Sequence, residues 1–482
     1  MELTSTGIAG LDNILGGGLP RGRFHLIEGP PGVGKTTLGL EFALAGVRNG
    51  ERCLYVTFGE TRSELEDVAA SHGWSLEGLN IHDHPAEVEA TLADPQTVFL
   101  PAEVELSDAA RILREGIERV RPHRAVIDGL SELRLLAGDA LDFRHQIMLL
   151  KRLFARPDCT LLLLHDRSAV TELAGLRTLA YGVIELDQET PEFGPQRRRL
   201  HVLKMRGRSF HSGYHDCRIV SGGMQVFPRL VAAQYRRDVP AGTVSSGLPA
   251  LDAMLGGGLS RGTSCILVGP AGVGKSTCAM QFAAAAAERG EQAAIYLFEE
   301  SRNVLLTRAE SLGLPLSKHV ASGRIRIRPV NLGEFMPGEF ISMVTENVSA
   351  GARWVIIDSL TGYARITEDH ILLLSELLSY LGQQGVVTLL VVGQHGLGFP
   401  MAMPSIDLSY LADAVLMFRY YEFAGEVRKA ISMFKKRTGP HETTLRDFRL
   451  GASGILIGEP LTRFHGILTG TPVQDKTDDR AG

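Results

Sequence analysis

The sequence predicts an α/β chain of two tandem domains, each with a mostly parallel sheet and helices on both faces. One observation is a repeat: "GIAGLDNILGGGLPRG" at 7–22 returns as "GLPALDAMLGGGLSRG" at 247–262. A second is the glycine-rich loop "GPPGVGKTT" at 29–37, which returns at the same offset as "GPAGVGKST" at 269–277. The third is that short β-rich runs alternate with helical patterns. Motifs repeated in one order indicate a tandem duplication.

The first half shows the expected elements in order. Its helices are expected to begin near Lys35 and to cover 62–72 and 143–155, and its strands to cover 23–29, 53–58, 124–130, 160–166, 181–187 and 197–207. Strands separated by helices pair in parallel, whereas strands close in sequence pair antiparallel. The last strands are therefore expected to form an antiparallel edge.

The same patterns set the domain boundaries. We expect a first domain at 1–235, a second at 242–470 and a disordered tail at 471–482, since "GTPVQDKTDDRAG" is polar. Residues 221–242, ending in "RRDVPAG", are expected to connect the two domains.

Each glycine-rich loop has the form G-x-x-x-x-G-K-[ST] between a strand and a helix, which is a P-loop. Glycines let the backbone curl so that its N–H groups face phosphate oxygens. Lys35 and Lys275 are expected to reach the β- and γ-phosphates of ATP, and Thr36 and Ser276 to hold Mg²⁺. The predicted ATP-binding residues are Gly29, Gly32, Gly34, Lys35, Thr36 and Thr37 in the first copy and Gly269, Gly272, Gly274, Lys275, Ser276 and Thr277 in the second.

Two aspartates end apolar runs, Asp128 in "AVIDGL" and Asp358 in "VIIDSL". A carboxylate at the carboxyl edge of a parallel sheet can orient Mg²⁺ directly or through water, so both are candidate metal residues. The alternative is that each caps the following helix.

The two copies differ after the second strand, where "LYVTFGET" at 54–61 corresponds to "AIYLFEES" at 294–301. A glutamate there can accept a proton from a water or hydroxyl that attacks phosphate. Glu60, Glu299 and Glu300 are therefore candidate catalytic residues, and Gly59 replaces one carboxylate of the first copy. Either the first site works with one glutamate, or the missing one was never catalytic.

A pair of cations ends a late strand in each copy: Lys204 and Arg206 in "KMR", Lys435 and Arg437 in "KKR". Residues i and i+2 of a strand share a face. Such pairs are either a solvated sheet edge or cations delivered to the γ-phosphate of a neighbouring subunit. The second arrangement is heterologous, and its closure forms a ring.

Further polar residues follow strands near the same crevice. His165 and the pair Gln394–His395 either sense the γ-phosphate or cap the sheet, and Ser71 and Trp74 are expected near the adenine.

Composition limits which binding partners and which cellular compartment we expect for the protein. Fifty basic and 55 acidic side chains give a net charge of −5, which argues against nucleic acid as a partner. The start "MELTSTGIAG" lacks signal-peptide features, no apolar run reaches the ~20 residues of a membrane span, and the five cysteines form no CxxC pair. A cytoplasmic protein without membrane contact is expected.

Together these motifs resemble the RecA/DnaB superfamily, specifically the KaiC family of tandem circadian-clock ATPases, from "TGIAGLDNILGGGLPRG" to about "FHGILTGTP". The resemblance implies two RecA-like P-loop NTPase domains, assembled as a homohexamer with ATP at subunit interfaces. It also implies that the first ring hydrolyses ATP and that the second phosphorylates its own hydroxyls. The family's paired glutamates match Glu299 and Glu300, with Glu60 alone in the first copy.

The family's phosphoacceptors are adjacent hydroxyls before an Asp-containing strand, which places Ser409 and Tyr410 of "DLSYLADAVLMF" at those positions. Tyr410 departs from the usual Ser or Thr, and a rigid phenol would present its oxygen poorly to a γ-phosphate. One acceptor, Ser409, is therefore expected; the alternative for Ser409 is an ordinary loop hydroxyl.

The predicted function is thus ATP hydrolysis with serine/threonine autophosphorylation in circadian or signalling timing, with clock or signalling proteins as further partners. Two alternatives share the scaffold. One is a DNA-acting RecA/DnaB-type ATPase, and the other is a signalling scaffold assembled by nucleotide.

Overall fold

The structure is a computed structural model of the chain. The residues it describes are 2–83, 116–130, 147–148, 158–167, 174–190, 196–331, 334–363, 370–393, 410–462, 464–465, 467 and 473–474. They fall into two compact units, residues 1–229 and 230–482, which are described separately.

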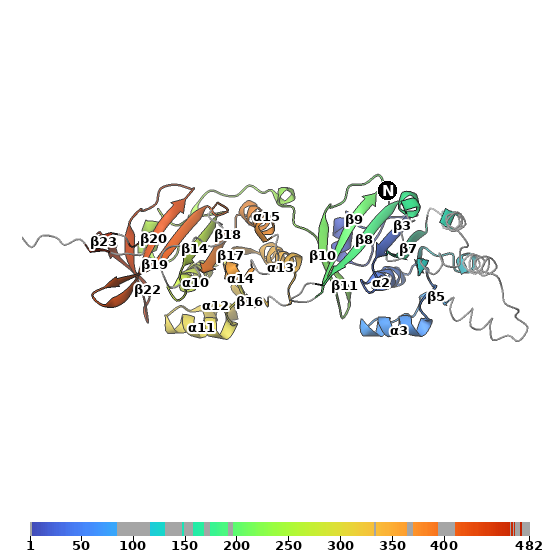
Figure 1. The fold of residues 1–482 in the computed structure, drawn as a ribbon, viewed down its shortest axis with the longest axis horizontal. Helices are drawn as coiled ribbons and strands as arrows, with labels where there is room; N and C mark the ends of the chain where they lie inside the picture. The colour runs from blue at the N-terminus through green and yellow to red at the C-terminus, as the bar shows by residue number, and fades with distance from the viewer. Residues whose placement is uncertain are drawn as a thin grey trace, which may run out of the picture. The chain divides into compact units, whose positions relative to one another are not determined.

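The first unit alternates strands and helices as predicted (Figure 1). Its strands are β1 Leu3–Thr4, β2 Leu19–Pro20, β3 Phe24–Gly29, β4 Cys53–Thr57, β5 Asn80–Asp83, β6 Arg124–Asp128, β7 Thr160–Asp166, β8 Gly182–Glu189, β9 Arg197–Met205, β10 Tyr214–Val220 and β11 Gly223–Phe227. Its helices are α1 Ala9–Ile14, α2 Lys35–Arg48, α3 Arg62–Ser71 and α8 Ala174–Leu179.

Nine of these strands form one sheet, in the order β11-β10-β9-β8-β3-β7-β6-β4-β5. The six strands from β8 to β5 are parallel, whereas β9, β10 and β11 add an antiparallel edge. In a parallel sheet the carboxyl ends of all strands meet at one edge, so the P-loop after β3 and the residues after β4 and β6 lie together.

The second unit repeats this plan. Its strands are β12 Thr243–Val244, β13 Leu259–Ser260, β14 Ser264–Gly269, β15 Gln292–Leu297, β16 Ile325–Pro329, β17 Ala352–Asp358, β18 Val387–Gly393, β19 Ala414–Phe423, β20 Glu426–Lys436, β21 Leu445–Gly451, β22 Gly454–Pro460, β23 Phe464–His465 and β24 Val473–Gln474. Its helices are α9 Pro249–Met254, α10 Lys275–Glu288, α11 Arg302–Ser311, α12 Leu316–Ala321, α13 Pro337–Ser349, α14 Leu360–Tyr363 and α15 His370–Gln383, with a 3-10 turn η1 at Ala232–Tyr235. The sheet order β16-β15-β17-β18-β14-β19-β20-β21-β22 matches the first sheet strand for strand.

Each sheet is covered on both faces. Successive residues of β3 enter different cores: Ile27 packs with α2 on one face, and Leu26 packs with Leu176 of α8 on the other. In the second unit α10 lies on one face of the sheet, and α13 and α15 lie on the other. The predicted fold class, two tandem α/β units with mostly parallel sheets, is confirmed.

Boundary details differ from the expectation. Gly223–Phe227, expected in the connecting segment, forms β11, because "GMQVF" alternates buried and exposed side chains against β10. Residues 230–235, expected in the first domain, belong to the second unit, where the N–H of Ala232 donates to Glu376 of α15 (3.0 Å). In the predicted disordered tail, Val473–Gln474 pairs with β23.

Candidate nucleotide sites

The first P-loop runs from the end of β3 into α2. Gly34 is the N-cap of α2 and has φ +109°, a left-handed conformation that glycine adopts without strain. Lys35 folds back over the loop, and its Nζ donates to the carbonyl oxygens of Gly29 (2.9 Å) and Pro30 (2.8 Å). The first N–H groups of a helix have no carbonyl partner within that helix, so the start of α2 can bind an anion.

The second P-loop has the same geometry. Gly274 caps α10 with φ +117°, and Lys275 Nζ donates to the carbonyl oxygens of Gly269 (2.8 Å) and Pro270 (2.7 Å). Burial lowers the pKa of Lys275 to about 8, against the opposing effect of the Asp358 and Glu299 carboxylates. A phosphate in this loop would restore the full positive charge of the lysine.

Asp128 ends β6 beside the first P-loop. Its Oδ2 accepts hydrogen bonds from Thr36 Oγ1 (2.8 Å) and from the buried hydroxyl of Tyr55 (2.6 Å). Burial raises the pKa of Asp128, and these donors act in the opposite direction. Thr36 and Asp128, predicted as metal residues from distant parts of the sequence, are thus in direct contact.

Asp358 occupies the same place beside the second P-loop. Ser276 hydrogen-bonds to its carboxylate, whose buried Oδ2 has no hydrogen-bond partner among the described residues. The residue matching Tyr55 is Ile295, which has no donor to offer. A buried carboxylate oxygen with an open acceptor position beside a serine hydroxyl fits the oxygen ligands that Mg²⁺ prefers.

The three candidate glutamates follow β4 and β15 and have different surroundings. Glu299 is exposed, and its charge acts on Lys275 and Asp358. Glu300 is partly buried and pairs with Arg308 of α11 (2.9 Å); burial raises its pKa and Arg308 counteracts this. In the first unit Glu60 closes a turn with Thr57, whose Oγ1 donates to the Glu60 carbonyl oxygen (2.8 Å).

Strands β10 and β11 pack against the first P-loop through Ile219 and Met224. A Cβ built on Gly34 would lie 2.5 Å from Ile219 Cδ1, and one built on Gly223 would lie 2.5 Å from the Trp74 ring. Trp74 therefore lies beside the start of β11, and its place near the adenine stays a prediction. Ser71 instead donates to a carbonyl of its own helix.

His165 and Asp166 end β7 beside the first P-loop strand. Asp166 Oδ2 lies 3.8 Å from Lys35 Nζ. His165 lies on the opposite face of the sheet, is 2% exposed, and has a pKa lowered to about 4 mainly by burial. The charges of Lys35 and Arg177 add to the lowering of the His165 pKa, and the role of His165 at the γ-phosphate stays a prediction. The pair Gln394–His395 lies outside the described residues.

The four strand-end cations lie at the opposite ends of the parallel strands from the P-loops. The backbone N–H of Arg206 donates to Tyr181, whose own N–H donates to Phe24 at the start of β3. In the second unit Arg437 and Asp413 make the equivalent bonds to Ser264 at the start of β14. Each P-loop follows the far end of that six-residue strand, roughly 17 Å away.

Within one chain these cations bind backbone carbonyls. Lys204 Nζ donates to Arg177 (2.6 Å) and Arg206 to Thr178 (2.6 Å), at the end of α8. In the second unit Lys435 donates to Ala412 (2.8 Å) and Arg437 to Tyr410 (2.8 Å). The last two carbonyls belong to the segment that follows Ser409, a residue outside the described range.

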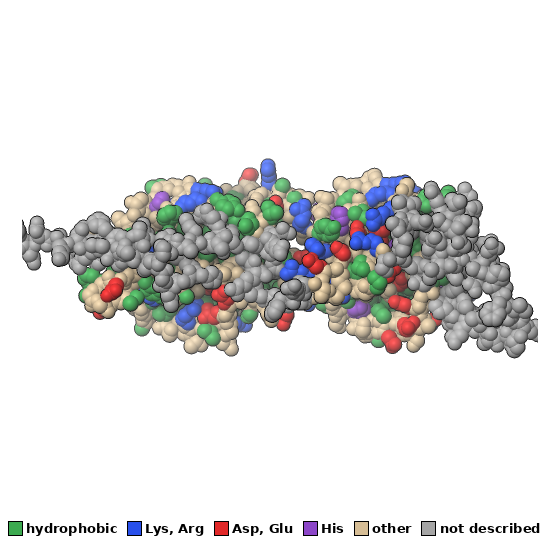
Figure 2. Space-filling view, in the orientation of Figure 1, with side chains coloured by type: hydrophobic (Ala, Val, Ile, Leu, Met, Phe, Trp, Pro, Cys, Tyr) green, Lys and Arg blue, Asp and Glu red, His purple; other side chains and the backbone are tan. Residues whose placement is uncertain are grey.

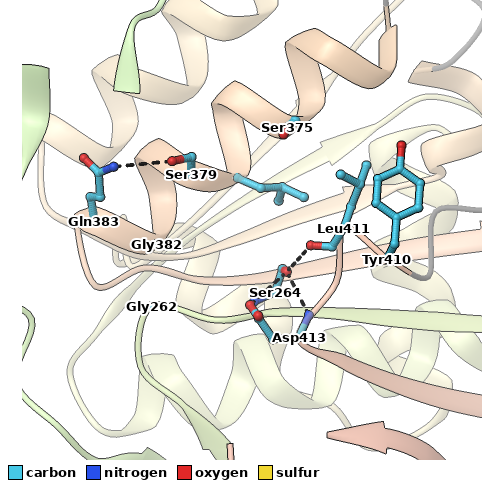
Figure 3. A pocket seen from close by; sticks show the side chains of 10 residues that line it. Gly262, Ser264, Ser375, Ser379, Gly382, Gln383, Tyr410, Leu411 and Asp413 are labelled. Carbon is cyan, nitrogen blue, oxygen red and sulfur yellow. Dashed lines mark hydrogen bonds between the residues drawn. The ribbon is translucent and has the colours of Figure 1, made fainter. Parts of the chain in front are cut away.

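A cavity of about 430 Å³ lies beside this segment. Tyr410 and Asp413 line it together with Ser264 and one side of α15, and Ser264 Oγ lies 3.3 Å from Asp413 Oδ2 (Figure 3). Tyr410 is 53% exposed. The predicted acceptor segment therefore meets the described structure at the edge that carries Arg437, away from the P-loop of its own unit.

Several site residues were missed by sequence reasoning. Tyr55 and Arg308 contact the candidate carboxylates, and Tyr420 and Lys429 donate to the carbonyl oxygens of Ala271 and Gly272 in the second P-loop, each at 3.1 Å. Tyr55 could have been found from the sequence, because aligning the two copies shows a hydroxyl-bearing Tyr55 where the second copy has the apolar Ile295. The other three carry no motif, so only the fold brings them to the site.

Two glycine loops that each open a helix, each with a hydroxyl residue beside a strand-end aspartate, define a tandem P-loop nucleoside triphosphatase on RecA-like sheets. A family model described as "ATPase: KaiC" matches residues 4–231 and 244–462. The chain belongs to the KaiC family, as its motifs predicted.

Curated relatives agree over the whole chain. The circadian clock oscillator protein KaiC of Acaryochloris marina (strain MBIC 11017) is 27% identical over 503 residues, 98% of this chain and 92% of the relative. That of Parasynechococcus marenigrum (strain WH8102) is 26% identical, with 99% and 94% covered. The circadian clock protein KaiC3 of Synechocystis sp. (strain ATCC 27184 / PCC 6803 / Kazusa) is 25% identical, with 98% and 95% covered.

No helix in the described part of the chain is long and apolar enough to cross a membrane. On the described face drawn in Figure 2, basic and acidic side chains are interspersed.

Proposed function

We propose that the chain binds Mg²⁺ and ATP at both P-loops, hydrolyses ATP as a homohexameric ring, and phosphorylates Ser409 in the second unit. The single observation that carries this proposal is that the P-loop and the cations lie at opposite ends of the parallel strands in each sheet. The roughly 17 Å between them exceeds the reach of a side chain. The four cations therefore contact a nucleotide held by a neighbouring copy; they are Lys204, Arg206, Lys435 and Arg437. Such contacts require a heterologous, closed assembly.

The second site has a complete set of groups for phosphoryl transfer. Mg²⁺, held by Ser276 and Asp358, would neutralise charge on the phosphates. Glu299, whose charge reaches Lys275 and Asp358, accepts the proton of the attacking oxygen. The oxygen of water or of the Ser409 hydroxyl bonds to the γ-phosphorus as the bond to ADP breaks.

The first site differs in its base. Gly59 stands where the second unit has Glu299, so Glu60 is the only candidate of the pair to take the proton from water. Thr36 and Asp128 would hold Mg²⁺ there. We propose that this site hydrolyses ATP without an acceptor hydroxyl. The printed names of the relatives support a role in circadian or signalling timing, with clock or signalling proteins as partners.

Intact-mass spectrometry after incubation with Mg-ATP, run beside a phosphate-release assay, tests the proposal. We expect one added phosphate per chain, its loss in Ser409→Ala, and light scattering that shows hexamers with ATP and smaller species without it. No mass gain with phosphate release would leave an ATPase or a nucleotide-assembled scaffold. A monomer that turns over ATP at full rate would overturn the role of the cations in a neighbouring site.

A DNA-acting motor is the second candidate, and charge argues against it. The net charge is −5, and the face in Figure 2 mixes both signs. Phosphate release stimulated by single-stranded DNA would favour the motor.

A further inference from the structure

A buried carboxylate adjoins the first P-loop. Glu28 is the last residue before Gly29 and is 1% exposed. Both of its oxygens accept from one guanidinium of α8: Arg177 Nε donates to Oε2 (3.2 Å) and Arg177 Nη2 donates to Oε1. A two-bond fork between guanidinium and carboxylate fixes geometry as well as charge. The pair therefore ties α8 firmly to the strand that ends in the P-loop.

The end of α8 also binds the two strand-end cations of the first unit. The carbonyl of Arg177 accepts from Lys204 Nζ (2.6 Å), and the next carbonyl, that of Thr178, accepts from Arg206 (2.6 Å). A continuous series of contacts thus runs from Gly29 through Glu28 and Arg177 to Lys204. It joins the two edges of one sheet that are separated by the length of β3.

The second unit lacks this connection. In the strand pairing that places Glu28 opposite His165, the second unit has Val268 opposite Val392. Val268 is apolar and buried, so no ion pair can form at that position. The fork is a feature of the first unit and not of the shared fold.

We propose that Glu28 and Arg177 are positioning residues of the first unit, which couple the state of its P-loop to the placement of Lys204 and Arg206 for the neighbouring nucleotide. This inference rests on the proposed function of those cations. A phosphate that draws Lys35 away from the Gly29 carbonyl shifts the end of β3. Because packed interiors and paired ions pass on small displacements, the end of α8 moves with it.

The test uses the full chain with Lys275→Ala, so that phosphate release reports the first site alone. Replacing both members of the fork, Glu28→Val with Arg177→Ser, leaves no unpaired buried charge. We expect kcat to fall about 10-fold with KM for ATP changed less than about 2-fold, because positioning for the chemical step affects kcat. Arg177→Lys keeps the charge without the fork and should give an intermediate kcat.

Arg199→Ala is the matched control, since Arg199 pairs with Glu189 (2.9 Å) on the surface of the same unit, and its kcat should stay unchanged. Thermal unfolding checks that the double replacement remains folded. If it unfolds, Arg177→Lys and Arg177→Gln provide the same comparison of kcat with KM.

A double-mutant cycle with Arg206→Ala decides whether the fork acts through the cations. Non-additive losses in kcat support the proposal, since coupled residues act as a unit. Additive losses, or an unchanged kcat in the fork variant, overturn it. If Arg206→Ala by itself leaves kcat unchanged, the proposed function of the cations fails instead, so the two failures are distinguishable.

Discussion

Both units have an aspartate at the predicted metal position, but the groups that contact this aspartate differ between the units. Asp128 is fixed by two donors, Thr36 and the buried Tyr55, whereas Asp358 keeps an oxygen without a hydrogen-bond partner among the described residues. The difference comes from one substitution in a repeated strand, Tyr55 against Ile295. Duplication therefore preserved the backbone of the site while its second layer of contacts diverged.

The candidate proton acceptors also differ between the two units, and here the second unit has the larger set. The second unit has two carboxylates after β15, of which Glu300 is engaged by Arg308 and Glu299 is exposed near Lys275. The first unit has Gly59 and Glu60, and Val68 stands where the repeat places Arg308. The first unit therefore holds its metal-side aspartate with more hydrogen bonds, whereas the second unit has more carboxylates near the predicted phosphate position.

The largest expected effect is on the single base of the first unit. In a Lys275→Ala background, Glu60→Gln should lower phosphate release at least about 100-fold while fluorescent-nucleotide binding persists, because the proton acceptor is lost. Gly59→Glu should leave turnover equal or higher, since it restores the carboxylate of the second unit. Full turnover in Glu60→Gln would remove the base assignment.

A smaller effect is expected from the second layer of contacts. Tyr55→Phe removes one of the two donors that orient Asp128, so half-maximal turnover of the first unit should require about 10-fold more Mg²⁺. Tyr296→Phe is the matched control, because the Tyr296 hydroxyl bonds to Asn347 and not to an aspartate. An equal Mg²⁺ requirement in Tyr55→Phe and the unaltered chain would contradict the orienting role.

Removing Arg308 should alter the second unit modestly. Arg308 counteracts the rise in the pKa of Asp358 and of Glu300 that burial causes, and Asp358 has to be ionised to hold Mg²⁺, so Arg308→Val should move the acid limb of the pH–rate profile to higher pH. In a Lys35→Ala background we expect turnover at pH 6 to fall roughly 2- to 5-fold, with little change at pH 8. Arg302→Ala on the same helix should leave the profile in place.

The smallest effect concerns stability. Burial raises the pKa of Glu41 on α2 to about 7, against the N–H of Met224, whereas the second unit has Gln281 at this position. A raised folded-state pKa contributes stability that is present below the unfolded value of 4.5 and lost as pH rises through 7. Glu41→Gln should therefore raise the calorimetric midpoint of the first unit at pH 8 more than at pH 5. An equal change at both pH values would refute this.

Most of the fold could be predicted, since the repeat and the alternation of strands and helices are local patterns. The strand Gly223–Phe227 was missed because five residues after a glycine pair look like a connection until β10 provides a partner. The fork between Glu28 and Arg177 could not be foreseen, because 149 residues separate them and neither belongs to a motif.

The amino-acid sequence by itself determined the two P-loops, the strand-end aspartates and the family. These features depend on residues a few positions apart, where the backbone geometry follows from local chemistry. Only the tertiary structure decided which donors surround Asp128 and Asp358, which glutamate is engaged by Arg308, and that the cations lie across the sheet from their own P-loop. Those relations depend on strand order and register, which bring distant residues together through pairing and burial along the whole chain.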